Sequence, residues 1–225
     1  MMRKYLNVKI NYNALLLRRE YRKSSKYDLT LTKELEEILI GLMLGDLFAE
    51  KSKENSNTRL QFKQSIKNKA YIDHLYILFE NYCKTPPKIN ISKDTRVGKK
   101  DTNESIKFWT LSLPCFNKFR ELYYDSAGIK HIPDNLIDIL TARSLAYWIM
   151  DDGYKTTNGF YLCTESYSLE ENYKISELLK AKFELDCGVH KHTNGYRLYI
   201  FSKSKDKLLS LIQPYLIEHF YYKFK

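Results

Sequence analysis

The chain of 225 residues is poor in the residues that interrupt regular structure, with only 8 Gly and 5 Pro. Its four cysteines are scattered and form no Cys-x-x-Cys pair, so neither a zinc site nor a disulfide framework is expected, and the thiols are predicted to be reduced. No apolar run reaches about 18 residues, which excludes a membrane-spanning helix. Hydrophobic residues make up 44% of the chain, which excludes a largely disordered protein.

Acidic residues are scarce relative to basic ones, with 27 Asp and Glu against 37 Lys and Arg and a formal net charge of +10. This excess indicates a polyanionic partner. Tyrosine is abundant, with 19 residues. AT-rich codons, as in an organellar genome, explain this bias, and the alternative is that tyrosine suits a sheet facing nucleic acid. The basic segment 1–33 is interpreted as a partly ordered arm rather than a mitochondrial presequence, because it retains Glu20.

An internal repeat organises the rest of the chain. The helix predicted at 35–48 contains Gly-Asp near its end, and the helix predicted at 144–153 ends in Asp-Asp-Gly. Each is followed by strand-like segments of alternating polarity and by further amphipathic helices. The other predicted elements are strands at 59–64, 88–91, 106–111, 159–164, 187–190 and 196–201, and helices at 69–82, 114–124, 169–183 and 205–215.

The repeat predicts an α+β fold in which an α-β-β-α-β-β-α unit occurs twice, as a pseudosymmetric pair of domains rather than a solenoid. The predicted domains are 34–125 and 141–225, joined by a linker at 126–140. Gly41 and Gly45 lie four residues apart on one face of the first helix, which allows a second helix to approach closely.

If these two helices pair, Asp46 and Asp152 emerge side by side at one end. A carboxylate at a helix C-terminus is disfavoured by about 0.3–1 kcal/mol, and two together repel each other. A divalent cation resolves this conflict, because Mg²⁺ prefers one or two carboxylates together with waters and substrate phosphates. The alternative is that both are unrelated turn residues. Their matched positions in a basic protein favour the metal site.

The segments Leu39–Leu47 and Leu145–Gly153 resemble the two LAGLIDADG motifs of single-chain homing endonucleases of organellar group I introns. The similarity covers about residues 35–225 and is strongest around SLAYWIMDDG, QFKQSIKNKAYIDHL and QPYLIEHFYYK, which look like the yeast mitochondrial branch. Leu47 and Tyr147 depart from the motif, because each stands where the family has glycine.

The resemblance implies two domains packed through their LAGLIDADG helices, with antiparallel sheets that form a saddle in the DNA major groove. It implies a monomer that cuts both strands of a long asymmetric duplex. It also implies Mg²⁺ as the cofactor, with Mn²⁺ or Ca²⁺ as substitutes in binding, and a mitochondrial location.

Roles for particular residues also follow from the resemblance. Asp46 and Asp152 are the expected catalytic metal ligands. The other implied site residues are the backbone carbonyls of Gly45 and Asp151 as further ligands, Lys130 and Lys223 as catalytic lysines, and Gln61, with Cys163 or Thr164 as its counterpart, as a contact of metal-bound water. Without their motif positions, the two lysines would be interpreted as solvated charges, because a basic protein has many.

The strands are expected to read the DNA, because a two-stranded ribbon fits the major groove. Which face points to DNA stays open, since a register error of one residue exchanges the two sets of side chains. The predicted DNA-binding residues are Arg59, Gln61, Lys63, Lys107, Trp109, Lys191, His192, Arg197 and Tyr199, with Lys99, Lys100 and Lys203 as phosphate contacts.

Three alternatives compete with the endonuclease. The first is a maturase that binds intron RNA on the same scaffold, and the second is a DNA-binding protein that does not cleave. Both acidic residues are intact, which favours the nuclease. The third is an unrelated nuclease fold, but the chain has no Asp/Glu-x-Lys tripeptide, which argues against a restriction-enzyme type of site.

Overall fold

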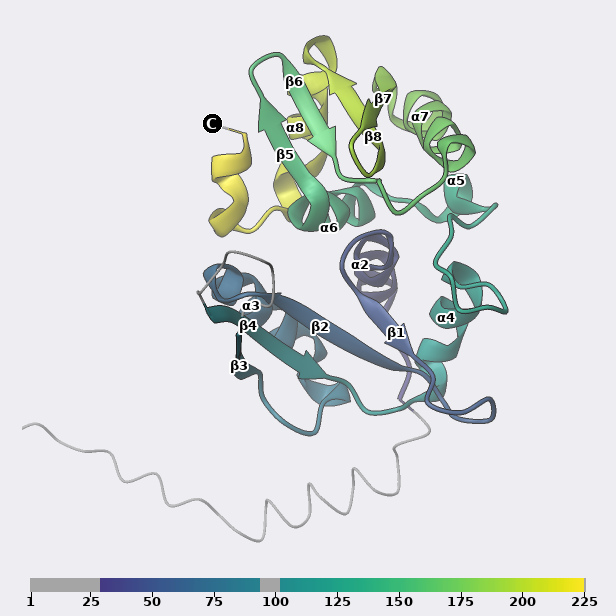
Figure 1. Ribbon diagram of the computed structural model, residues 1–225, viewed down its shortest axis with the longest axis vertical. Coiled ribbons are helices and arrows are strands. Elements are labelled where there is room, and N and C mark those ends of the chain that lie inside the picture. Colours follow the sequence, from purple (N-terminus) through teal and green to yellow (C-terminus); the bar gives the residue numbers. More distant parts are fainter. Residues whose placement is uncertain (1–28, 94–101, 225) are drawn as a thin grey trace, which may run out of the picture. The chain divides into compact units, whose positions relative to one another are not determined.

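Two four-stranded antiparallel sheets carry the fold of the described residues, 29–93 and 102–224, in a computed structural model (Figure 1). Most of the predicted basic arm and the predicted phosphate contacts Lys99 and Lys100 lie outside the described residues. The strand order is β1-β2-β4-β3 in one sheet and β5-β6-β8-β7 in the other. The strands are β1 (Phe48–Glu50), β2 (Arg59–Ser65), β3 (Lys88–Lys93), β4 (Thr102–Trp109), β5 (Gly153–Thr156), β6 (Gly159–Leu162), β7 (Cys187–His192) and β8 (Gly195–Phe201).

Helices occupy corresponding places in the two halves, which confirms the predicted α-β-β-α-β-β-α repeat and the α+β class. Within the described residues, every helix is too short or too polar to cross a bilayer. The α-helices are α2 (Lys33–Leu44), α3 (Lys69–Phe79), α4 (Asn117–Tyr123), α5 (Leu136–Ile139), α6 (Ala142–Asp152), α7 (Leu169–Phe183) and α8 (Lys205–Ile212). Short 3-10 turns are η1 (Ile66–Asn68), η2 (Glu80–Tyr82), η3 (Pro114–Phe116), η4 (Ser202–Ser204), η5 (Gln213–Tyr215) and η6 (Glu218–Lys223).

The first strand of each sheet could not be located from the sequence. Strands β1 and β5 have three and four residues, which is too few for a clear alternation of polarity. The first helix was predicted to reach residue 48, but α2 ends at Leu44, and the N–H of Leu47 turns back to the carbonyl of Leu42 at 3.1 Å. The chain therefore leaves α2 through a tight turn that contains Asp46 and leads directly into β1.

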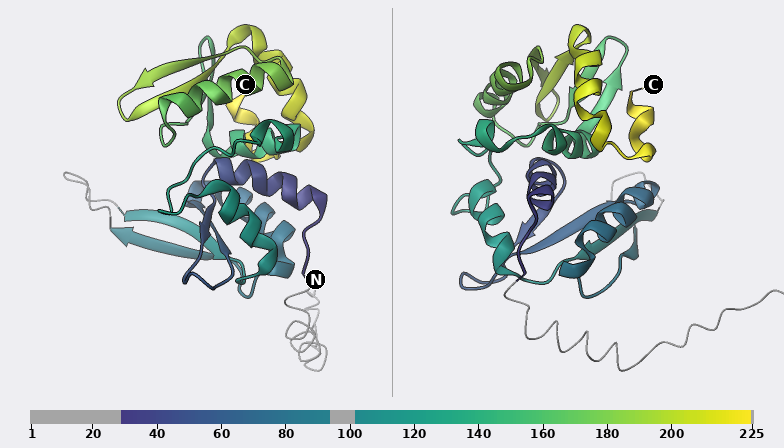
Figure 2. Two further views of the ribbon diagram at one scale, coloured as in Figure 1. Left: turned by 90° about the vertical axis from the view of Figure 1, so that its right-hand side faces the viewer. Right: turned by 180° about the vertical axis from the view of Figure 1, so that it is seen from behind.

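Helices α2 and α6 pack side by side between the two sheets, as Figure 1 shows. A Cβ atom on Gly41 would lie 2.0 Å from the carbonyl oxygen of Ser144, so only glycine permits this approach. Leu39, Met43 and Leu145 are fully buried in the surrounding core. In the left view of Figure 2, the hairpins β3–β4 and β7–β8 extend toward the same side of these helices.

Candidate functional site

The C-terminal ends of α2 and α6 bring three carboxylates together. Gly45 caps α2 and Asp46 follows it, whereas α6 ends at Asp152 itself. The N–H of Asp46 donates to Oδ2 of Asp151 at 3.1 Å. A Cβ atom on Gly45 would lie 2.6 Å from the same oxygen, so the contact depends on glycine at this position. We call Asp46, Asp151 and Asp152 the acidic cluster.

Within the acidic cluster, the surroundings of Asp151 and Asp152 disfavour the negative charge of these two carboxylates. Burial and the nearby Asp46 carboxylate raise the pKa of Asp152 to about 7, against the opposing effect of Lys130 and Lys223. Burial, followed by the two neighbouring carboxylates, raises the pKa of Asp151 well above its ordinary value. The negative ends of two helix dipoles add to this repulsion. A divalent cation is the kind of ligand that would relieve it.

Lys130 borders the cluster from the segment between α4 and α5. Its Nζ donates to the carbonyl oxygen of Gly45 at 2.6 Å and to that of Leu47 at 3.2 Å. Burial lowers the pKa of Lys130 to about 8, although the acidic cluster opposes this shift. A lysine with such a pKa can exchange a proton near neutral pH.

Lys223 approaches the cluster from η6 and is 8% exposed. Its Nζ donates to the carbonyl oxygens of Met150 at 2.7 Å and Ile149 at 3.1 Å, in the last turn of α6. Burial lowers the pKa of Lys223. The ammonium group satisfies carbonyls that the end of a helix leaves without partners, and it places a positive charge where the helix dipole favours one.

The polar strand residue beside the acids is Gln64, not the predicted Gln61. Nε2 of Gln64 donates to Oδ2 of Asp46 at 2.8 Å and lies 3.5 Å from Oδ1 of Asp151. Gln61 is three residues earlier on β2, so it points to the opposite face, where its partner is Trp109. Gln64, which was not predicted, is therefore the strand glutamine in direct contact with the acids, because the register of β2 turns it toward the helices, and a contact of Gln61 with metal-bound water stays a prediction.

Two further residues extend this contact, and neither was predicted from the sequence. Nδ2 of Asn68 donates to Oε1 of Gln64 at 3.0 Å, and Nε2 of His219 lies 3.2 Å from Oδ1 of Asn68. The three side chains come from β2, η1 and η6, so both halves of the chain contribute. Nothing in the local sequence pattern connects them.

The two proposed counterparts of Gln61 have different environments. Thr164 is fully buried, and its hydroxyl bonds the side chain of Asn172 and accepts the N–H of Leu198 at 3.0 Å. Cys163 instead lines a cleft of about 520 Å³, together with Asp152 and Lys130. Of the two, only Cys163 adjoins the acidic cluster.

The outward face of the first sheet gathers five predicted DNA contacts. The register places Gln61 opposite Trp109 and Lys63 opposite Lys107. The Arg59 guanidinium lies 4.2 Å from the centre of the Trp109 ring and pairs with the carboxylate of Glu50. The alternating side chains Leu60 and Phe62 face the core. The outward set therefore combines three basic side chains with Gln61 and Trp109 across β2 and β4.

The second sheet separates residues that were predicted as one group. Arg197, Tyr199 and His192 share the outward face. Lys191 pairs with Tyr196 on the opposite face, because adjacent strand residues point in opposite directions, so Lys191 and His192 cannot both contact DNA from the outward face. His190 takes the outward position opposite Arg197 and was not predicted.

Lys203 lies in η4, beyond the end of β8. Its side chain is 70% exposed, and its Nζ forms an ion pair with Oδ2 of Asp186 at 2.7 Å. It is therefore set apart from the strand residues, which suits a contact with the phosphate backbone rather than with bases.

Comparison with known proteins gives consistent matches. Residues 36–208 match the profile of the LAGLIDADG DNA endonuclease family. A probable intron-encoded endonuclease 1 of Wickerhamomyces canadensis is 36% identical over 86% of this chain and 85% of its own length. A cytochrome b mRNA maturase bI2 of Debaryomyces hansenii is 34% identical over 86% of this chain and 74% of its own length. The solved structure of the homing endonuclease I-WcaI bound to its DNA recognition sequence is 31% identical, covers 97% of this chain and 96% of that chain, and has a TM-score of 0.83.

Proposed function

The chain belongs to the LAGLIDADG DNA endonuclease family, and from this premise we propose that it is a monomeric homing endonuclease that hydrolyses both strands of a long, asymmetric duplex site. The observation that carries the proposal is the acidic cluster, which has the ammonium groups of Lys130 and Lys223 beside it. The net charge of +10 and the basic outward face of the first sheet support a duplex as the substrate.

We propose a divalent cation, Mg²⁺, as the cofactor, with Mn²⁺ or Ca²⁺ able to replace it in binding. Among the described residues, no three His, Cys, Asp or Glu side chains are arranged as a closed metal site. Mg²⁺ does not need one, because it commonly binds one or two carboxylates and completes its shell with waters and phosphate oxygens. Asp46 and Asp152 would hold the ion, and the carbonyls of Gly45 and Asp151 are further candidate ligands.

When bound, such an ion lowers the pKa of a coordinated water and stabilises negative charge on the phosphate. The contribution of the protein is to fix the surrounding groups. Gln64 holds the Asp46 carboxylate through a hydrogen bond of 2.8 Å. Lys130, whose pKa is about 8, lies at the cleft that Asp152 also lines, where it can orient a water molecule or accept its proton. Lys223 is positioned to place positive charge on the other side of the cluster.

Substitution of the acids tests this proposal. Asp46→Asn and Asp152→Asn keep the shape of each side chain but remove the charge that would bind a cation. We expect each variant to lose double-strand cleavage of a randomised duplex library in Mg²⁺, while Ca²⁺-supported duplex binding persists. Asp206→Asn, at an exposed position on α8, is the matched control and should cleave like the parent protein. Full cleavage by either cluster variant would refute the proposed site.

A maturase is the second candidate, because two relatives carry that name, at 34% and 30% identity. A maturase binds intron RNA, so the discriminating observation is which nucleic acid the intact chain retains. Discrete duplex cleavage supports the endonuclease, whereas intron RNA binding without duplex binding supports the maturase. The similarity to relatives named as an intron-encoded endonuclease and cytochrome b mRNA maturases leads us to propose a mitochondrial location. We also propose a first domain at 34–125, a linker at 126–140 and a second domain at 141–225.

A further inference from the structure

The outward face of the second sheet carries a row of aromatic rings that the proposed function does not explain. We call Tyr154, Tyr161, His190, Tyr199 and Phe201 the aromatic ridge. Neighbouring ring centres are 4.7 Å apart for Tyr161 and Tyr199, 4.8 Å for His190 and Tyr199, 5.4 Å for Tyr199 and Phe201, and 5.5 Å for Tyr154 and Tyr161. The first four side chains are half-buried, and Phe201 is 38% exposed.

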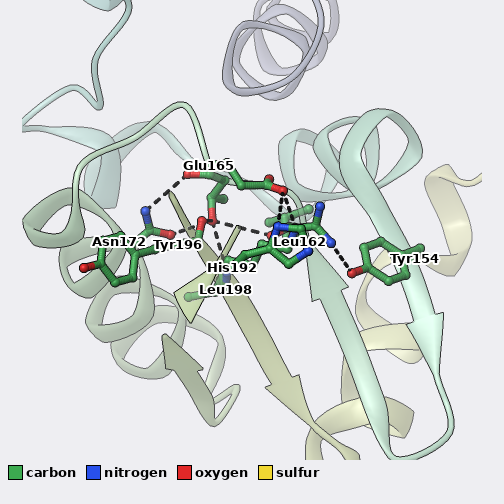
Figure 3. A network of polar contacts seen from close by, with 9 residues as sticks. Tyr154, Leu162, Glu165, Asn172, His192, Tyr196 and Leu198 are labelled. Atoms are coloured by element: carbon green, nitrogen blue, oxygen red, sulfur yellow. Dashed lines mark hydrogen bonds and ion pairs between the residues drawn. The ribbon is translucent and has the colours of Figure 1, made fainter. Parts of the chain in front are cut away.

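The polar atoms of the ridge are largely engaged within the protein. The Tyr161 hydroxyl lies 2.8 Å from Nδ1 of His190, and the Tyr199 hydroxyl donates to the carbonyl of Asn158 at 2.6 Å. The Tyr154 hydroxyl accepts a hydrogen bond from Nη1 of Arg197 at 2.6 Å, as Figure 3 shows. The ridge therefore offers a partner mainly carbon atoms and few free donors.

The positive charge on this face is also small. Among the outward residues of β5 to β8, Arg197 is the one lysine or arginine, and Nε of this side chain pairs with the Glu165 carboxylate. The same oxygen of the Glu165 carboxylate also lies 3.6 Å from Nδ1 of His192, and both of these residues are labelled in Figure 3. Glu165 thus partly neutralises the one fixed cation of the face.

The first sheet has different chemistry at the corresponding positions. The cross-strand pair Gln61–Trp109 occupies the place that Tyr161–Tyr199 occupies in the second sheet. Next to it lies Lys63–Lys107, and Lys88 continues the basic row across β3. The first sheet therefore combines lysines and a glutamine with the rings of Phe48 and Trp109, whereas the second sheet presents mainly aromatic rings.

The arrangement of the rings favours contact with a duplex over stacking on unpaired bases. Tyr154 and Tyr161 stack on each other at an interplanar angle of 25°, and His190 and Tyr199 do so at 21°. Each stacked pair covers one face of each of its rings, and Phe201 meets Tyr199 edge to face, so less ring face remains for unpaired bases to stack on. In the major groove, the apolar feature that ring edges can recognise is the C5-methyl group of thymine.

We propose, resting on the proposed function, that the aromatic ridge recognises thymine methyl groups, so that the half-site bound by the second half of the chain is rich in T·A pairs. The first sheet reads the other half-site through hydrogen bonds and charge. Arg197, held by Glu165 and Tyr154, supplies the fixed positive charge among the outward strand residues that face the second half-site.

Exchange of thymine for deoxyuridine tests the proposal, because it removes the methyl group and leaves pairing and charge unchanged. A duplex target is first selected from a randomised library by the intact chain in Ca²⁺. Deoxyuridine is then placed in one half-site at a time, and the Kd is measured. We expect a loss of about fourfold for each contacted methyl group in one half-site, and a change of less than twofold in the other.

Variants identify which sheet causes the effect. We call the Kd for the deoxyuridine duplex divided by the Kd for the thymine duplex the deoxyuridine ratio. In Tyr161→Ala this ratio should fall toward one. Tyr161→Phe keeps the ring and should keep the ratio of the parent protein. Gln61→Ala, the matched change in the first sheet, is expected to weaken binding without changing the ratio. The comparison of the two duplexes with the parent protein does not depend on any variant folding.

Each other outcome overturns the proposal in a recognisable way. If the selected target is cleaved but deoxyuridine in either half-site leaves the Kd unchanged, the ridge proposal is refuted and the endonuclease proposal stands. A ratio that persists in Tyr161→Ala, when that variant is folded, assigns the methyl contacts elsewhere and also removes it. Binding of single-stranded RNA with no duplex binding removes both proposals.

Discussion

At the scale of single residues, the acidic cluster is arranged for chemistry at the expense of stability. Asp152 is half-buried, lies near Asp46 and stands at the negative end of a helix dipole. Its pKa of about 7 is well above that of a free aspartate, so its ionised form is less favourable in the folded chain than in the unfolded chain. Lys130 and Lys223 offset only part of this effect.

The sign of the pKa shift predicts a stabilising substitution. A carboxyl group with a raised folded-state pKa is neutral in both states below about pH 4, and it destabilises the fold increasingly as the pH rises to about 7. Asp152→Asn should therefore raise the Tm at pH 7.5, without divalent ions, by on the order of 5 °C. The gain should diminish as the pH falls toward 4, as followed by calorimetry.

A matched control for this measurement is Asp186→Asn. Hydrogen bonding to Lys203 lowers the pKa of Asp186, so its ionised form is favoured by folding and its removal should lower the Tm rather than raise it. A decrease in Tm for Asp152→Asn at pH 7.5 would contradict the assigned direction of its pKa shift.

At the scale of elements, the contact between α2 and α6 determines where the acids meet. The spacing of Gly41 and Gly45 predicted this close approach, and both glycines lie at the contact with α6. The atom nearest to a Cβ on Gly41 is the Ser144 carbonyl oxygen, which belongs to the backbone and cannot move away by a change of rotamer. The helix pair therefore tolerates no side chain at this position.

Gly41→Ala tests this contact, because alanine in a helix ordinarily stabilises by about 1 kcal/mol relative to glycine. At this site we expect the opposite sign, a loss of about 1–3 kcal/mol from overpacking, measured by urea denaturation. Gly41→Ala combined with Ser144→Gly should not recover the loss, since the obstacle is a backbone atom. Recovery in the double variant would show that the Ser144 side chain, and not its carbonyl, limits the approach.

Periodicity of the sequence was sufficient for the long helices and the central strands, but not for positions that depend on register. Gln61 and Gln64 are equally polar, and only the pairing of β2 with β4 shows that Gln64 faces the helices. Lys191 and His192 are adjacent, and only the pairing of β7 with β8 assigns them to opposite faces. Pairing partners are distant in sequence, so a local pattern contains no information about them.

At the scale of the whole molecule, the repeat has kept its fold while the two outward faces have diverged. The pair Gln61–Trp109, flanked by Lys63–Lys107, stands in one half where Tyr161–Tyr199 stands in the other. A net charge of +10 thus does not mean that both halves bind nucleic acid through electrostatic contacts to the same extent. This divergence was not visible from composition, because basic and aromatic residues are counted there without their faces.

The salt dependence of binding separates the electrostatic contribution of the lysines from the apolar contribution of the tyrosines. Each lysine that neutralises a phosphate contributes about −0.9 to the slope of log K against log salt concentration, through release of condensed counterions. We expect Lys63→Ala and Lys107→Ala each to reduce that slope by about one. Tyr161→Ala should weaken binding with the slope unchanged, because methyl contacts release no counterions. Fluorescence anisotropy of the labelled target between 50 and 200 mM salt gives the Kd of the parent protein and of the three variants. A slope that falls in the tyrosine variant but not in the lysine variants would reverse the assignment of charge and apolar recognition to the two sheets.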